Sequence, residues 1–502
     1  MNPLLPISRL WLYPCLLLLC SSPLTAANSP LPTLFQHDPG SENAAAGAAM
    51  RELMQRPTTL RATRVHWTPD AFANQRLILN PFTDVHLDAT HTPIGFTGAR
   101  HQTWFGTLSN NQGSAVFILN GGRLSGKINS TSGTFEIFPQ ENQSCIIVQH
   151  GPAHWPGCNV NSLTSSQPLA LSSANSSVAS DVPTITMEDS PGQDTTSENP
   201  IRVIIAYTAG AQFKTRAIYG RTMQEHIDLA LAETNQGYAN SGVNLRLELA
   251  CLYETGFLET TAIENDVEDF RNNGDGKGDE VHQLRADFDA DMCCLITDGR
   301  DYSWCGWSYG FDYTSRDNMF QATSYSCATG NFSFAHEFGH TQGCRHNDDL
   351  ALLPFPYGHG YRKDTYWATI MAMTTGTTAV RLNYWSNPRI PSPLLPHTPM
   401  GTPEDGDNFA NDCCTALNVS SETVINHEST PSNSDAPTNH SFSSDEFADK
   451  LVTETLTVAT FTANPGAQIQ FRAGSSIILQ PGFHAQAGSE FQATLTTPEP
   501  PP

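Results

Sequence analysis

Residues 336–346 read His-Glu-Phe-Gly-His-Thr-Gln-Gly-Cys-Arg-His, and this stretch decides how the rest of the chain is interpreted. It fits the pattern H-E-x-x-H-x-x-G-x-x-H, whose spacing has a direct physical meaning. On a helix, His336 and His340 lie one turn apart on the same face, so both imidazoles can reach one metal ion. Gly343 can adopt the left-handed conformation that ends a helix, and the chain then returns His346 as a third ligand.

The chemistry of these residue types indicates a catalytic site. Three imidazoles leave the fourth position of a zinc ion open, whereas structural zinc sites are closed. Zinc held in this way lowers the pKa of its bound water to about 7. Glu337, beside the first ligand, can accept the proton of that water and pass it to a leaving amine. The sequence therefore predicts one catalytic zinc ion on His336, His340 and His346, with Glu337 as general base of peptide-bond hydrolysis. A surface helix that is merely His-rich is the weaker alternative.

The extended motif resembles the metzincin metallopeptidases, and more closely their reprolysin-like branch. Thr369-Ile370-Met371-Ala372-Met373 looks like the Met-turn, which implies that Met371 supports the metal site from below. Tyr384-Trp385-Ser386-Asn387-Pro388 is similar to the segment that follows this turn in secreted bacterial members. The resemblance covers roughly residues 200–425. It implies a mixed α/β fold, in which a metzincin-like catalytic domain (a twisted sheet plus the zinc helix) lies between a β-rich N-terminal prodomain and a small C-terminal β module.

The resemblance also implies a substrate strand and shows two departures. Cys305-Gly306-Trp307 corresponds to the edge strand that pairs with extended substrate, so Gly306 and Trp307 are expected there. Reprolysins place Asp directly after the third histidine, whereas here Asn347 intervenes and Asp348 follows. Other metzincins carry Tyr two residues after the Met-turn methionine, and here that position is Met373. Neither departure removes a ligand or the base.

Composition and hydrophobic pattern divide the chain into segments. An apolar run behind Arg9, followed by a small-residue site, is typical of a secretory signal peptide. Short apolar runs broken by Gly, Asn and Pro predict a β-rich region before residue 160. Beyond Ile201, buried strands alternate with helical patterns such as 222–239 and 281–288, which favours a mixed sheet packed by helices. The expected segments are a signal peptide (1–27), a β-rich propeptide-like domain (28–160), a linker (161–199), the catalytic domain (200–427), a second linker (428–450) and a small β-stack module (451–497).

Cysteine usage bears on latency. The chain has 12 cysteines, and Cys15 and Cys20 leave with the signal peptide. Export makes disulfides the default for the rest. A thiolate from the N-terminal domain, Cys145 or Cys158, could occupy the open zinc position and keep the enzyme inactive. The even count favours a Cys145–Cys158 disulfide over such a free thiol, and Cys344 is likewise expected in a disulfide.

The charge balance limits the partners. The 26 basic and 50 acidic residues give a formal net charge of −24, so nucleic acid is a poor partner. No segment after the signal peptide is long enough to span a bilayer. The Gly-rich loop 273–279 resembles an acidic loop that could bind calcium, but it lacks the spacing of a calcium-binding hand. A turn that caps the next helix is therefore favoured. The expected partners are protein or peptide substrates.

Location and specificity are predicted less directly. The protein is expected to be secreted by a bacterium, with attachment to the cell surface through the C-terminal module, which looks like β-stack repeats of gliding-type bacteria. Some members of the bacterial subgroup cut beside acidic residues, and Arg381 and Arg389 are the cations to consider for such a pocket. No pattern in the sequence places either one.

Two other functions compete with zinc-dependent peptide-bond hydrolysis. The first is a surface binding protein on a peptidase-like scaffold that has lost activity. Such scaffolds tend to lose the Glu or a ligand, and here all four residues are present, which favours catalysis. The second is an amidase that acts on a non-protein polymer with the same zinc chemistry.

Overall fold

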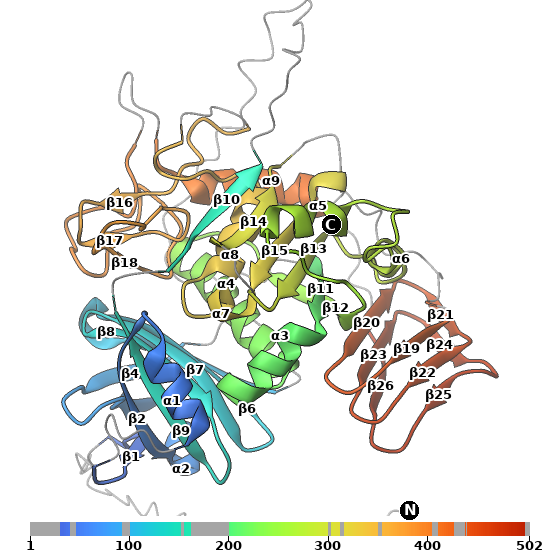
Figure 1. Ribbon diagram of the computed structural model, residues 1–502, viewed down its shortest axis with the longest axis horizontal. Coiled ribbons are helices and arrows are strands. Elements are labelled where there is room, and N and C mark those ends of the chain that lie inside the picture. Colours follow the sequence, from blue (N-terminus) through green and yellow to red (C-terminus); the bar gives the residue numbers. More distant parts are fainter. Residues whose placement is uncertain are drawn as a thin grey trace, which may run out of the picture.

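The computed structural model describes residues 31–40, 47–92, 101–151, 155–161, 200–299, 303–311, 316–349, 354–403, 410–425, 437 and 439–496. Figure 1 shows three bodies: an N-terminal sheet in blue, a central α/β body in green to orange, and a C-terminal stack of strands in red. The expected signal peptide and nearly all of the linker 161–199 lie outside the described residues. Within the described part, no helix is both long and apolar enough to cross a membrane.

The N-terminal body is an antiparallel sheet. In the described residues it has nine strands in the order β1-β2-β9-β8-β7-β6-β5-β4-β3, and its elements begin before residue 60, in a stretch whose composition carries no fold signal. Its apolar face buries large side chains such as Trp67, Phe117 and Phe135. The elements are β1 (Phe35–His37), α1 (Ala48–Gln55), β2 (Thr59–Trp67), α2 (Pro69–Phe72), β3 (Arg76–Leu79), β4 (Leu87–His91), β5 (Gln102–Leu108), η1 (Ser109–Asn111), β6 (Gly113–Asn120), β7 (Arg123–Ser130), β8 (Gly133–Pro139) and β9 (Ser144–His150).

The central body is a mixed sheet with helices on both faces. Within the described residues the strand order is β10-β14-β15-β13-β11-β12-β20-β23-β26, and β11 is parallel to both of its neighbours. Along β11, Val203 and Ile205 face one core while Ile204 and Ala206 face the other, as the alternation of strand side chains requires. The strands first met here are β10 (Gly157–Asn161), β11 (Ile201–Thr208), β12 (Leu247–Thr255), β13 (Met292–Thr297), β14 (Trp304–Tyr309) and β15 (Phe320–Ser324).

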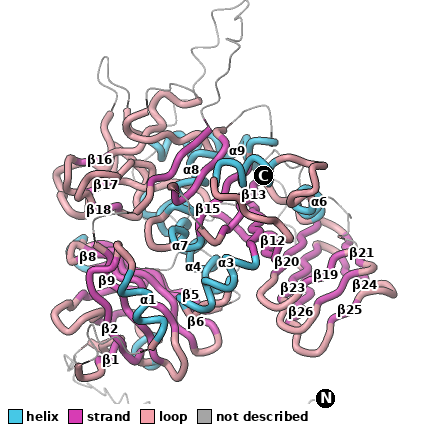
Figure 2. Tube along the Cα trace, in the orientation of Figure 1, coloured by secondary structure: helices cyan, strands magenta, loops and turns pink. Residues whose placement is uncertain are grey.

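Helices and short strands complete the central body, and Figure 2 shows that the helices gather around this sheet. Asp279, before α6, accepts backbone hydrogen bonds from Gly274 and Gly276, so the loop 273–279 is closed by its own carboxylate. The elements are α3 (Ala209–Lys214), η2 (Thr215–Tyr219), α4 (Met223–Ser241), α5 (Ile263–Arg271), α6 (Glu280–Asp287), η3 (Arg316–Asn318), α7 (Tyr325–Ala328), α8 (Ser333–Thr341), β16 (Arg362–Lys363), β17 (Trp367–Ala368), β18 (Val380–Arg381) and α9 (Cys413–Ile425).

Helix α4 joins the first two bodies. It begins with a capping box between Thr222 and Glu225 and ends at the left-handed Gly242, both typical helix signals. Nearly all of its residues are buried, because it packs between the central sheet and strand β6 of the N-terminal sheet. Phe105 and Val116 contact Leu229 across this boundary. An amphipathic helix has a single apolar stripe, so burial on all sides marks α4 as an interface helix.

The C-terminal module is a stack of parallel coils that continues the central sheet. Strand β20 pairs antiparallel with β12, and the pairing partners Phe447, Gln468 and Glu490 recur at intervals of 21 and 22 residues. The rings of Phe442, Phe461 and Phe483 stack from coil to coil. The strands are β19 (His440–Phe442), β20 (Phe447–Val452), β21 (Thr455–Val458), β22 (Phe461–Ala463), β23 (Gln468–Ala473), β24 (Ser476–Leu479), β25 (His484–Ala485) and β26 (Glu490–Leu495).

The start of this module differs from the sequence interpretation. Strand β19 and the first residues of β20 lie inside residues 428–450, which the polar composition assigned to a linker. The polar composition was misleading here because two neighbouring residues of β20, Asp449 and Lys450, are charged yet buried, each with an ion-pair partner. Charged side chains normally indicate solvent exposure, and only a partner elsewhere in the fold allows them to be buried.

Candidate metal centre

Helix α8 carries the first two histidines of the motif and the glutamate. His336, Glu337 and His340 are all buried. The helix ends at Thr341, and the chain turns at Gly343, whose φ of 98° is left-handed and whose missing Cβ would lie 2.6 Å from the ring of Phe355. A residue with a side chain is therefore excluded there both by conformation and by space. The turn brings His346 back to the other two histidines.

The three imidazoles converge on one point. The Nε2 atoms of His336 and His340 each lie 3.1 Å from Nε2 of His346. Tetrahedral zinc with bonds of 2.0–2.1 Å separates two nitrogen ligands by about 3.3 Å, so the spacing fits one small cation. Burial, reinforced by the neighbouring imidazoles, holds the pKa of His336 well below its ordinary value. Burial likewise lowers the pKa of His346 to about 4. Neutral imidazoles are the form that binds a metal.

Each ring is oriented through its other nitrogen. His336 Nδ1 donates to the carbonyl of Ile370 at 2.7 Å, and His340 Nδ1 donates to the carbonyl of Cys344 at 2.9 Å. These bonds fix the tautomers that leave lone pairs on Nε2. Lone pairs that face one another repel unless a cation lies between them, so the residues fit a bound metal.

The third ligand has a different supporting partner from the one suggested by the motif. His346 Nδ1 lies 3.7 Å from a carboxylate oxygen of Asp349, not of Asp348. Asn347, which stands where reprolysins have Asp, accepts a hydrogen bond from the backbone N–H of Met373 at 2.8 Å. The extra residue thus links the zinc loop to the Met-turn and displaces the carboxylate along the chain.

Glu337 lies between the helix and the strand β14. A Cβ on Gly306 would lie 2.5 Å from Oε1 of Glu337, so the strand approaches the carboxylate closely only because Gly306 has no side chain. Among the described residues neither carboxylate oxygen has a hydrogen-bond partner of ordinary geometry, although Cys158 and Ser308 lie beside it. Burial raises the pKa of Glu337 to about 8. A buried carboxylate with free lone pairs is suited to accept a proton.

Met371 lies against the zinc helix and is fully buried. A Cβ on Gly339, in the middle of the helix, would lie 2.4 Å from the sulfur of Met371 and 2.6 Å from the Trp385 ring. The Met-turn therefore packs on the bare backbone of Gly339. The backbone carbonyl of Ile370, in the same turn, accepts a hydrogen bond from His336. The Met-turn therefore fixes the first ligand both by packing and by a hydrogen bond.

Strand β14 carries Gly306 and Trp307, the predicted substrate edge, but another segment already pairs with it. Strand β10 runs parallel to β14, with Cys158 opposite Gly306 (Figure 1). The sulfur of Cys158, a ring nitrogen of His336 and a carboxylate oxygen of Glu337 lie within 4.8 Å of one another. The N-terminal segment thus brings a thiol to the metal centre.

The two candidate latency thiols are far apart in role. Cys145 lies in β9, buried in the N-terminal sheet, with its sulfur 3.5 Å from the carbonyl of Leu124. Both Cys145 and Cys158 are free, so the Cys145–Cys158 disulfide expected from the even count is wrong. Cys145 lies in the core of the N-terminal sheet, whereas Cys158 lies in strand β10, which pairs with β14 of the central sheet.

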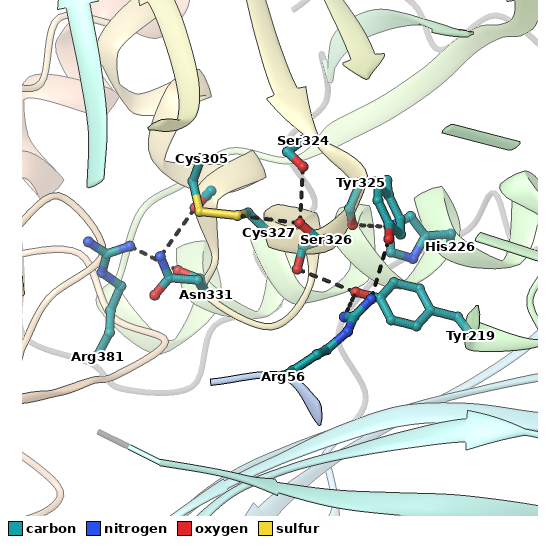
Figure 3. The surroundings of a disulfide bond; sticks show 11 residues. Arg56, Tyr219, His226, Cys305, Ser324, Tyr325, Ser326, Cys327, Asn331 and Arg381 are labelled. Carbon is teal, nitrogen blue, oxygen red and sulfur yellow. Dashed lines mark hydrogen bonds between the residues drawn. A yellow bond between two sulfur atoms is a disulfide. The ribbon is translucent and has the colours of Figure 1, made fainter. Parts of the chain in front are cut away.

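The remaining disulfide expectations are met in part. Cys305 and Cys327 form a disulfide that ties the edge strand β14 to α7 beside the zinc helix (Figure 3). Cys344, within the zinc motif, is buried and free, which corrects its expected pairing. Its sulfur lies 3.9 Å from the carbonyl of Cys413, so it fills core space as a small apolar side chain.

Two residues outside the motif lie near the centre, and the sequence alone does not place either of them there. His359 is buried and its Nδ1 contacts the carbonyl of His346 at 2.9 Å, which holds the backbone of the third ligand. Arg381 is buried, and its guanidinium donates to the carbonyls of Asn331 and Ala372, both at 2.9 Å. Both residues lie outside the motif, so spacing alone gives no signal for them.

Comparisons with known proteins agree with this centre. Residues 197–386 match the Reprolysin_5 profile of metallo-peptidase family M12. A peptidyl-Asp metalloendopeptidase of Xanthomonas campestris is 31% identical over 405 residues, which cover 76% of this chain and 91% of that protein. A peptidyl-Asp metalloendopeptidase of Stenotrophomonas maltophilia strain R551-3 is 40% identical over 214 residues, 41% of this chain and 49% of that protein. One from Pseudomonas fragi is 37% identical over 161 residues, 32% of this chain and 84% of that protein.

The fold and the centre define a metzincin-like metallopeptidase. The chain belongs to metallo-peptidase family M12 and is a zinc metalloendopeptidase of that family.

Proposed function

We propose that this protein is a secreted endopeptidase, made as an inactive precursor, that cuts peptide bonds beside aspartyl residues. The observation that carries the peptidase activity is the convergence of three neutral imidazoles next to the buried carboxylate of Glu337. The aspartyl preference is suggested by the names of the relatives. Export, and attachment to a cell surface through the C-terminal module, stay predictions of the sequence.

His336, His340 and His346 would hold the zinc ion, which supplies a polarised water and stabilises negative charge on the substrate carbonyl oxygen. Glu337 accepts the proton of the attacking water and delivers it to the leaving amine. Among the described residues its buried carboxylate oxygens have no hydrogen-bond donor of ordinary geometry, so their lone pairs are available to accept a proton. Strand β14 binds the substrate main chain by adding it as a further strand.

The test of this function is cleavage of an unfolded protein by the full chain after limited proteolysis within residues 161–199. A zinc chelator should abolish cleavage and added zinc should restore it. Glu337→Ala should lower kcat by about 10²- to 10⁴-fold while zinc content, measured by elemental analysis, stays at one ion per chain. No cleavage by folded, zinc-loaded wild type would contradict the proposal, as would full activity of the variant.

Latency rests on the position of strand β10. β14 would be an edge of the central sheet if β10 were absent, and β10 fills the place where a substrate would pair. Burial raises the pKa of the Cys158 thiol, as does the nearby Glu337, whereas a bound cation favours thiolate. Cys158 would then complete the zinc coordination and exclude water until the N-terminal part is removed.

Substitution of the two free thiols separates this role from general stability. Cys158→Ser should give measurable peptidase activity in the uncut chain, because a hydroxyl is a much weaker zinc ligand than a thiolate. Cys145→Ser is the matched control, since Cys145 is equally buried and free but lies in the core of the N-terminal sheet. Activity that stays absent in uncut Cys158→Ser, with a fold like the wild type by circular dichroism, would contradict thiol-based latency.

A further inference from the structure

Arg381 is a buried cation in the wall of the metal centre. It ends β18, which follows the Met-turn, and its side chain is 8% exposed. One guanidinium nitrogen donates to the carbonyl of Asn331 and another to the carbonyl of Ala372. Figure 3 shows the side chain reaching Asn331 next to the Cys305–Cys327 disulfide. The guanidinium therefore bridges the start of the zinc helix and the Met-turn.

In the part of the chain that the structure describes, no carboxylate pairs with Arg381. Its Nε is buried without a hydrogen-bond acceptor among the described residues, and the two carbonyls use only part of its five N–H donors. Two other buried cations of this protein do have carboxylate partners: Arg221 with Glu136 at 2.8 Å and Lys450 with Asp289 at 2.6 Å. A buried cation without its anion is costly, and the fold retains this one at the catalytic centre.

Arg381 lies within electrostatic range of the metal centre. Its charge interacts with Glu337 and with Cys158, the two residues that meet beside His336. Cys158 belongs to the strand that occupies the cleft, so the short side chain of a peptide bound along β14 comes within electrostatic reach of Arg381. Gly157 precedes Cys158 in β10, and a Cβ on Gly157 would lie 2.9 Å from Met373 and 3.0 Å from Trp304. The start of β10 is therefore closely packed.

We propose that Arg381 is the specificity-determining residue of the cleft: its unpaired Nε–H and buried charge bind the side-chain carboxylate of a substrate aspartate next to the scissile bond. This inference rests on the proposed peptidase function and adds the residue that selects the substrate. A site with a buried donor discriminates strongly against a substrate that cannot pair with it. Substrate carboxylate and Arg381 would form a charge-assisted pair.

Two other arginines are the competitors. Arg389 pairs with Asp412 at 2.7 Å, so its charge is already matched. Arg362 donates to the carbonyl of Met373 at 2.6 Å, also at the Met-turn, but it is partly exposed and lies 4.0 Å from Asp348. Arg362 is therefore a matched control, because it makes the same kind of backbone contact at the same turn without the buried, unpaired position.

The experiment compares two peptides that differ only by Asp or Asn at the cleavage position. The enzyme is the full chain activated by limited proteolysis within residues 161–199, and kcat/KM is measured for wild type, Arg381→Gln, Arg381→Lys and Arg362→Gln. Gln keeps an amide donor for the carbonyl of Asn331 or Ala372 but removes the charge. Arg381→Gln should lower the Asp/Asn ratio of kcat/KM about 10- to 100-fold. Arg362→Gln should keep the wild-type ratio.

Each outcome decides the proposal. An equal loss on both peptides in Arg381→Gln means that Arg381 only braces the Met-turn or adjusts Glu337, and overturns the inference while the peptidase function stands. Loss of the ratio in Arg362→Gln alone overturns it in favour of Arg362, and a wild type that cuts both peptides equally also overturns it. If Arg381→Gln does not fold, Arg381→Lys decides: a lowered ratio supports the inference and an unchanged ratio contradicts it. A wild type that cuts no peptide fails the proposed function itself.

Discussion

At the scale of residues, the metal centre depends on positions where a side chain is missing. Gly339 lets Met371 and Trp385 pack on the zinc helix, and Gly306 lets strand β14 approach Glu337. Neither glycine needs an unusual backbone conformation, since a left-handed φ occurs at neither of them. Their role is to leave space, and at Gly306 this space lets the strand pack directly against the buried carboxylate of Glu337.

Gly306→Ala should therefore impair catalysis more than folding. The added methyl would meet Glu337 Oε1 at 2.5 Å, so either the strand or the carboxylate must move, and displacement of a catalytic group by about 1 Å can cost roughly 10²-fold in rate. We expect kcat/KM to fall at least about 10-fold and the free energy of unfolding to fall by about 1–3 kcal/mol. Steady-state kinetics and denaturant unfolding of the activated chain measure the two effects.

Gly256→Ala is the control for this substitution, because a Cβ at Gly256 meets nothing within 4 Å. It should leave both quantities near wild type. Zinc content should be unchanged in both variants, since neither glycine touches a ligand atom. A Gly306→Ala enzyme with wild-type kinetics would show that Glu337 has room to shift, which contradicts the close packing.

Prediction from sequence succeeded for contacts that are local along the chain. The spacing of His336, His340 and His346 is set by one helical turn and one glycine, so the pattern alone predicts their convergence. The groups that orient the ligands are not local: Ile370 lies 34 residues after His336. Arg381 is farther still, and nothing in its neighbours along the chain marks it as buried. Such residues become evident only when the fold brings the segments together.

At the scale of elements, buried strands were predictable and paired polar strands were not. The apolar runs of β11 and β13 announce strands covered on both faces. Strand β10 has only Gly157–Asn161 and carries no apolar pattern, and β20 hides its charges in ion pairs. Strand β10 lies at the edge of the sheet and β20 lies between β12 and β23, so for both the partner strand decides the structure.

The joint between β20 and the central sheet leads to a stability prediction. Asp449 accepts a hydrogen bond from Arg202 at 3.0 Å and from Arg472 at 2.9 Å. Burial alone would raise the pKa of Asp449, but these arginines outweigh it and lower the pKa. Asp449→Asn removes one of the two carboxylates that pair with Arg202, while Glu248 remains at 3.0 Å, so the free energy of unfolding should fall by about 1–3 kcal/mol. Denaturant unfolding monitored by fluorescence measures this loss.

Glu490→Gln, on the exposed strand β26 of the same module, is the matched control and should stay within about 0.5 kcal/mol of wild type. If the module were a detached spacer, Asp449→Asn would unfold the coils and leave the peptidase activity and its thermal inactivation untouched. That result would contradict a shared sheet. A parallel loss of activity at lower denaturant concentration supports it.

At the scale of the whole molecule, the N-terminal sheet is held to the catalytic part by buried charges. Lys127 from β7 donates to the carbonyls of Thr329 and Gly330, just before the zinc helix. Glu136 from β8 pairs with Arg221 at 2.8 Å. In both contacts one partner belongs to the N-terminal sheet and the other to the central body. If the N-terminal part is removed, the polar groups left on the central body can be solvated by water.

This interface should respond to pH through Glu233 on α4, which faces Lys127, Glu136 and Arg221. Burial raises the pKa of Glu233 to about 8 from its ordinary 4.5, so the bound state holds a proton that the separated state has lost between these values. Binding of the cut N-terminal part should therefore weaken as pH rises from 5 to 8, by up to about tenfold per unit. Glu136 acts in the opposite sense. Burial alone would raise its pKa, but Arg221 and His150 hold it well below 4.5, so its contribution is lost only as pH falls below about 4.5.

The rate and extent of release of the N-terminal fragment, after the chain is cut within residues 161–199, measure this dependence by size-exclusion chromatography at each pH. Glu233→Gln should flatten the dependence between pH 5 and 8, because the amide does not titrate. Glu141→Gln, an exposed residue of the same N-terminal body, should keep the wild-type slope. An unchanged slope in Glu233→Gln would mean that another group controls release. A flattened slope would make the protonation of one buried carboxyl the link between the pH of the surroundings and exposure of the metal centre.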